Sequence, residues 1–249
     1  MEGNNSILEG HSDIEKAAYL GAIASIATAD RQATEQELEY ISGLSAAAGL
    51  SPDQSATVQN AATDMKGSEL TKNLDVLKNS NLKFSLIADL MTFAKSDNDY
   101  NEEETESIHK IAEYLGVDQH QFSLLDQVAD KATNADIETT PNNPQNILNT
   151  SGIKDKLENA GINSNSLLKG LVSIAAPLIL SRIFSRGMSG SGSTGGLGGA
   201  LGGALGGNLG GLSGGGGGGL GSLIGMLSGG RGMGSAGGLL SRILGGGGF

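Results

Sequence analysis

Two stretches in the first half of the chain repeat one pattern of apolar and polar positions. They start at Tyr19 and Ser85, and an offset of 67 residues brings their apolar positions into register. In each copy, apolar residues recur every three or four positions, which predicts an apolar helix, a short acidic loop and an amphipathic helix that ends at glycine. The matched pairs include Leu20 with Ile87, Ile23 with Leu90, Ile41 with Ile108, Leu44 with Ile111, and Gly49 with Gly116.

Capping residues predict where these helices begin. Ser12 is followed three residues later by Glu15, a capping box that predicts a helix from here to about Ala29. Thr34 and Glu37 form the same pattern before a helix that Gly49 ends. No stretch before residue 131 has the alternation of a strand. The other predicted helix starts are Ser51, Ser68, Asn81 or Ser85, Asn101, Asp118 and Ile153.

Each copy has one wide apolar stripe, which a single helix pair cannot bury alone. The pattern therefore predicts an all-α fold, a compact bundle of about seven helices in which two pseudo-twofold-related copies share one core. We divide the chain into five parts by pattern and composition. These are a disordered lead-in (1–12), a helical domain (13–133), a linker with a short helix (134–166), an apolar basic segment (167–186) and a glycine-rich tail (187–249).

Charge and glycine content change sharply at Gly161. All 27 acidic residues precede it and the net charge up to that point is −16, whereas the remainder has a net charge of +5 and 33 of the 41 glycines. An acidic domain disfavours nucleic acid as a partner and favours cations or basic proteins. With no cysteine, the chain has no disulfide or thiolate metal site. No signal-peptide pattern is visible, so we expect a cytoplasmic protein.

The acidic loops admit two interpretations. In the first, Asp30 and Asp97 shape turns, while Glu37 and Glu104 complete capping boxes and complement the helix dipole. In the second, oxygen ligands form a site for a divalent cation such as calcium, magnesium or manganese, because crowded carboxylates favour a counter-ion. The loop at 97–108 is not an EF-hand, since its sixth and twelfth positions lack the required glycine and glutamate. The candidate ligands are Asp97, Asp99, Glu104, Asp30 and Glu37.

This arrangement of two helical copies around acidic loops resembles the TerB family. That family includes tellurite-resistance proteins and is similar to the amino-terminal domain of the membrane-anchored DjlA co-chaperones. The resemblance covers about residues 13–133 and implies a non-catalytic helical domain of stress-response complexes with acidic, metal-binding loops. The matching positions are Asp30, Glu37, Asp97 and Glu104, whereas Arg31 and Asn98 depart from the small residue that tends to follow the aspartate.

No pattern of catalytic residues typical of an enzyme accompanies these loops in the sequence. His11, His109 and His120 are scattered, and each is interpreted as a surface histidine. The glycine-rich region follows no strand and lacks the Lys-Ser or Lys-Thr pair of a phosphate-binding loop. We therefore expect a protein that is not an enzyme and has no cofactor besides a divalent cation.

The most apolar stretch of the chain runs from Leu167 to Phe184. Lys169 and Arg182 bracket only about a dozen apolar residues, which Pro177 interrupts, and this is short of the roughly 20 that cross a bilayer. The stretch therefore fits a re-entrant or interfacial segment whose basic residues meet anionic headgroups. Beyond it, leucines recur every fourth residue with glycines between them, a pattern that allows close helix packing. A flexible spacer, membrane association and self-assembly all fit this composition. The leucines are Leu197, Leu201, Leu205 and Leu209.

Two functions follow from these features. The first is an interaction module with acidic loops, held at the inner face of the membrane by residues 167–249, which bind the membrane surface or protein partners. The second is a self-assembling structural protein, a homo-oligomer whose tail polymerises and displays the helical domain. Neither function involves nucleic acid.

Overall fold

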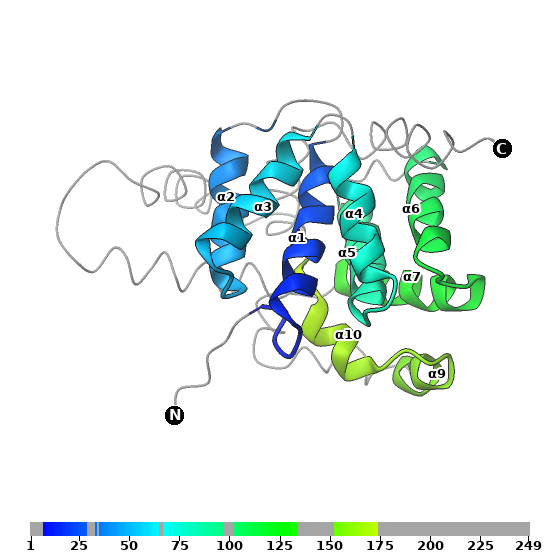
Figure 1. Ribbon diagram of the computed structural model, residues 1–249. Coiled ribbons are helices and arrows are strands. Elements are labelled where there is room, and N and C mark those ends of the chain that lie inside the picture. Colours follow the sequence, from blue (N-terminus) through cyan, green and yellow to red (C-terminus); the bar gives the residue numbers. More distant parts are fainter. Residues whose placement is uncertain are drawn as a thin grey trace, which may run out of the picture.

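The computed structural model describes residues 7–28, 33, 35–64, 67–96, 102–133 and 152–173, and within these ranges it contains helices and no strands (Figure 1). Seven helices lie in the predicted domain and two follow it, which confirms the all-α prediction. They are α1 (Asp13–Ala27), α2 (Glu35–Ala47), α3 (Pro52–Thr63), α4 (Ser68–Leu77), α5 (Leu82–Ser96), α6 (Glu102–Tyr114), α7 (Gln119–Thr133), α9 (Ile153–Asn159) and α10 (Ser164–Gly170).

The internal repeat is visible in where the helices begin. α2 starts at Glu35 and α6 at Glu102, and the same 67-residue offset separates Pro52 of α3 from Gln119 of α7. In the first copy α1 packs against α2 and α3, and in the second copy α5 packs against α6 and α7. The repeated apolar pattern therefore specifies a repeated helix packing.

The predicted capping signals act as expected where the structure describes them. The Glu15 amide donates to Ser12 Oγ (3.3 Å) and the Ser12 amide donates to Glu15 Oε2 (2.9 Å), and a second capping box begins α3. Beyond α2 and α6, Gly49 and Gly116 have φ angles of 74° and 71°. This left-handed conformation strains residues with a Cβ, so glycine ends both helices at equivalent positions.

Both copies bury their apolar faces in one core, as predicted, and this core extends beyond residues 13–133. The lead-in contributes Ile7 and Leu8, which are fully buried. α9 packs against α7 and α10 against α5 (Figure 1). These contacts place residues 152–173 on the bundle. The buried apolar residues of this segment are Ile153, Leu157, Ile162, Leu167, Leu168, Leu171 and Val172.

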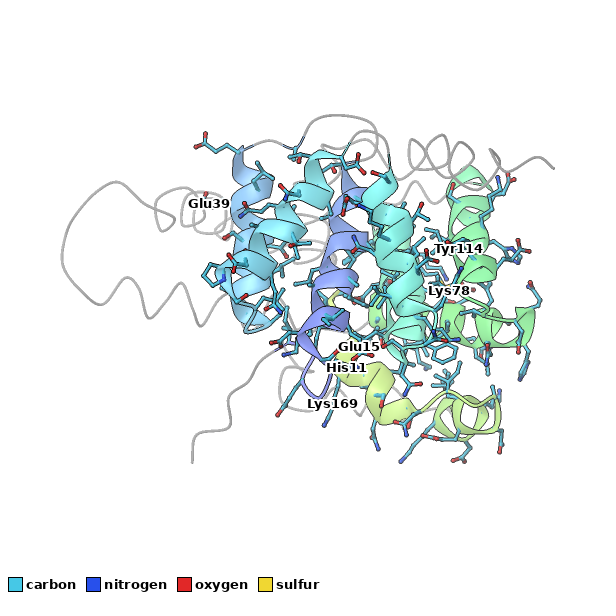
Figure 2. All side chains as sticks on the ribbon, in the orientation of Figure 1. His11, Glu15, Glu39, Lys78, Tyr114 and Lys169 are labelled. Carbon is cyan, nitrogen blue, oxygen red and sulfur yellow. The ribbon has the colours of Figure 1, made fainter. Side chains whose placement is uncertain are left out.

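Polar contacts at the surface hold the copies in register. Tyr114 of α6 donates its hydroxyl to Asp75 Oδ1 of α4 (2.7 Å), and the Lys78 ammonium lies 3.7 Å from the centre of the Tyr114 ring. Figure 2 shows Lys78 and Tyr114 together between these two helices. A cation over an aromatic ring contributes about 0.5–1 kcal/mol at an exposed site. The contact therefore gives a modest link between α4 and the second copy.

A shared core predicts that both copies unfold together. Leu90 is 1% exposed, so Leu90→Ala should lower the free energy of unfolding by about 2–5 kcal/mol within a single transition. Urea unfolding followed by circular dichroism measures this. Val76→Ala is the control, because Val76 is 38% exposed and its truncation should have little effect. Two separate transitions would contradict the shared core.

Candidate functional site

The five predicted cation ligands belong to segments that the structure describes only in part. Asp30, Asp97 and Asp99 lie outside the described residues. Glu37 and Glu104 occupy the third position of α2 and of α6, and their side chains lie outside the described part. The structure thus gives the two glutamates equivalent backbone positions and does not place the carboxylates.

Helix ends beside both acidic loops lie at one end of the bundle. In Figure 1, α1 ends, and α2 and α6 begin, at the upper end. Among the side chains that the structure describes, no group of three His, Asp or Glu residues could hold a metal ion. The described acids nearby include Glu106, which pairs with Lys110 at 2.8 Å.

A buried carboxylate lies at the middle of α5, at a position that sequence reasoning did not single out. Asp89 is 0% exposed, and four donors converge on it. Oδ2 accepts from the Tyr19 hydroxyl of α1 (2.5 Å) and from the Val172 amide (2.8 Å). Oδ1 accepts from the amide (3.2 Å) and the hydroxyl (2.5 Å) of Ser173. One side chain therefore joins both copies to the C-terminal segment.

Local backbone geometry explains why two successive amides reach Asp89. Leu171 is extended after the end of α10, and Val172 and Ser173 return to helical conformation. The first amides of a helical turn have no partner within the helix. Asp89 satisfies two of them from a neighbouring helix, in the manner of an N-cap residue.

Part of the chain matches a known protein family. Residues 16–127 match the family model described as Tellurite resistance protein TerB. These residues form a TerB domain. No curated protein and no solved structure matched the chain. The resemblance inferred from the duplicated helices is thereby confirmed. Tyr19 and Asp89 lie inside the TerB domain, whereas Val172 and Ser173 lie outside the match.

Burial sets the protonation behaviour of this site in the TerB domain. It raises the pKa of Asp89 to about 6, although the donors from Ser173, Tyr19 and Val172 favour the charged form. Burial and the nearby carboxylate raise the pKa of Tyr19 well above its usual value. Either hydroxyl can reverse its hydrogen bond and accept from a protonated Asp89. Both backbone bonds can therefore persist when the carboxyl is neutral.

A second polar cluster lies at the lower end of the TerB domain, near α10. Figure 2 shows His11, Glu15 and Lys169 there. Hydrogen bonds from Ser80 and Ser12 lower the pKa of Glu15 to about 2. Partial burial lowers the pKa of His11, and the positive charge of Lys169 contributes. His11 is thus half-buried, whereas the sequence suggested a surface histidine.

The predicted apolar segment and tail are described only at their beginning. Residues 167–173 are described, whereas 174–249 lie outside the described part of the chain. No helix in the described ranges combines the length and the apolar character needed to span a bilayer.

One sequence signal could have identified Asp89. It is the only charged residue between Lys83 and Lys95, and at the repeat offset it replaces Ala22 of the first copy. An acid on the apolar side of a buried helix requires a partner. The partner was not apparent because its donors are 70 to 84 residues away in the chain.

The raised pKa of Asp89 predicts how stability depends on pH. The folded state binds a proton more tightly than the unfolded chain, whose aspartate pKa is about 4. The stabilisation is therefore complete below pH 4 and is lost as pH rises through about 6, a change of ~2–3 kcal/mol. His11 acts in the opposite sense, because its folded-state pKa is lowered.

Urea unfolding between pH 4 and 7.5 isolates this contribution when the parent chain is compared with Asp89→Asn. The variant keeps His11 and removes the titrating carboxyl. We expect the difference in unfolding free energy between the two chains to change across pH 4 to 6 and to level off above it. A constant difference would show that Asp89 does not titrate in this window.

Proposed function

We propose that this chain is a non-catalytic interaction module, a TerB domain whose C-terminal extension determines where in the cell it lies. The observation that supports this is that the first residues of that extension pack into the core of the domain. Leu167, Leu171 and Val172 are buried in the core, and Asp89 binds the amides of Val172 and Ser173. Whatever binds the tail is therefore connected to the domain through a fixed joint.

The membrane surface is the partner that the charge distribution favours for residues 167–249. This part of the chain contains no acid, and its basic residues adjoin apolar stretches. Anionic headgroups attract such segments by about 1 kcal/mol per basic residue near the surface. The acidic domain would be repelled from the same surface. We therefore place the protein in the cytoplasm, at the inner face of the membrane.

The acidic loops are proposed to bind a divalent cation. Glu37 and Glu104 occupy equivalent helical positions, and α2 and α6, which contain them, begin at the same end of the bundle (Figure 1). Asp97 and Asp99 would supply oxygen ligands beside Glu104, and Asp30 would do so beside Glu37. A bound cation would offset the repulsion among these carboxylates.

The second candidate function is structural. Leucine at every fourth residue, with glycines between, would let the tails of several chains pack closely. A homo-oligomer would then display the TerB domains on its outside.

Flotation with liposomes distinguishes the two functions. If the tail binds membranes, the full chain should float with vesicles containing anionic lipid, and a chain that ends after Ser173 should remain at the bottom. If the tail polymerises, the full chain should form large particles without lipid, visible by electron microscopy. A full chain that stays small and does not float would refute both functions.

Calorimetry tests the cation site. Titration of the full chain with calcium, magnesium, manganese or zinc should release or absorb heat, and Asp97→Asn should remove most of that signal because it deletes a charged ligand. Asp53→Asn is the matched control, since Asp53 is exposed in the first turn of α3. Absence of heat with every cation would leave the capping role as the explanation of the acidic residues.

A further inference from the structure

The two copies differ in which helix covers their first helix. In the first copy, α4 packs along α1, and Gly21 permits the approach because an added Cβ would lie 2.5 Å from Asn73 Nδ2. In the second copy, α10 takes this role on α5. A Cβ on Gly170 would lie 2.7 Å from the Ser85 Cβ. Glycine thus permits a close covering contact in each copy.

The connections that lead to these covering helices differ in reach. Residues 64–67 join α3 to α4 and extend at most about 14 Å, so α4 can cover only its own chain. Residues 134–151 join α7 to the segment of α9 and α10, and eighteen residues can extend to about 60 Å. A domain of this size has a diameter of about 40 Å. The second covering segment can therefore reach a neighbouring molecule.

We call residues 152–173 the docking segment, and the surface of α5 and α7 that it covers the acceptor face. Polar contacts fix the register between them. Gln121 of α7 donates to the Ala160 carbonyl (2.9 Å), Ser85 donates to the Leu167 carbonyl (3.1 Å), and Asp89 binds the residues after α10. Such satisfied contacts, of which those of Ser85 and Asp89 are buried, make the acceptor face selective for this segment.

We propose that the acceptor face binds the docking segment of a second copy of this chain, so that chains associate by exchanging residues 152–173. The same contacts form whether the segment comes from the same chain or from another, so exchange sacrifices none of them. Mutual exchange between two chains gives a closed dimer, and sequential exchange gives an open chain of molecules. This inference requires neither membrane binding nor a cation.

Cross-linking of the full chain tests the exchange, because the native sequence has no cysteine. One tagged copy carries Gln121→Cys on the acceptor face, and an untagged copy carries Ala160→Cys on the docking segment. The two are unfolded in urea, refolded together at several concentrations and treated with a short bismaleimide. We expect a cross-linked heterodimer several-fold above the control pair Asp53→Cys with Ala160→Cys, increasing with protein concentration.

The Asp89→Asn variant gives an outcome that nonspecific association would not. When the copy with Gln121→Cys also carries Asp89→Asn, the heterodimer should decrease several-fold, because the acceptor face is damaged. When the copy with Ala160→Cys carries it, the heterodimer should not decrease, since that copy's own segment is released. Gly170→Ala should decrease the heterodimer when the copy with Ala160→Cys carries it, because it damages the docking segment. It should not decrease the heterodimer when the copy with Gln121→Cys carries it. This variant provides a second test if Asp89→Asn fails to fold.

The proposal is overturned if the chain with both cysteines cross-links only within itself at every concentration, while the mixed single variants stay at the level of the control pair. Failure of the double variant to cross-link at all would overturn it as well, because the contact between Gln121 and Ala160 would then be absent in solution.

Discussion

The arrangement of this chain depends on one buried charge. A carboxylate removed from water loses several kcal/mol of hydration and is tolerated only when donors replace the lost water. For Asp89 these donors come from α1 and from residues 172–173, while Asp89 itself belongs to α5. The hydrogen bonds that compensate the burial of Asp89 therefore form only when all three parts are in place. One carboxylate thus links the two helical copies and the C-terminal segment.

This requirement also makes the two copies unequal despite their common pattern. At the position equivalent to Asp89, the first copy has Ala22, whose buried side chain needs no hydrogen-bond partner. A short connection brings α4 onto α1, and apolar burial is sufficient there. In the second copy, the covering segment at 152–173 follows α7 only after the eighteen residues 134–151. Because the Asp89 carboxylate accepts from several donors at once, it fixes the register of that distant segment. Apolar contacts alone would leave this register loosely specified.

The sequence predicted those features of the fold that depend on neighbouring residues. Periodicity located α1 to α7, Ser12 with Glu15 formed the expected capping box, and Gly49 and Gly116 ended their helices, because these signals act within a few residues. Burial of the docking segment was not predicted, since an apolar stripe does not identify its partner. For the same reason, Asp89 was not singled out from the sequence, because its donors are 70 to 84 residues away in the chain. The proposed cation ligands remain a prediction from the sequence.

The position of the joint also limits how the acidic loops and the tail can influence each other. Asp89 lies at the middle of α5, and the second acidic loop follows the C-terminal end of the same helix. A helix in a close-packed core moves as a unit, so a change at one end is transmitted along it. In the proposed cation site, ordering of the loop by an ion would therefore act on the helix that binds the amides of Val172 and Ser173. α5 is thus the helix that binds the start of the tail through Asp89 and that directly precedes the second acidic loop in the chain.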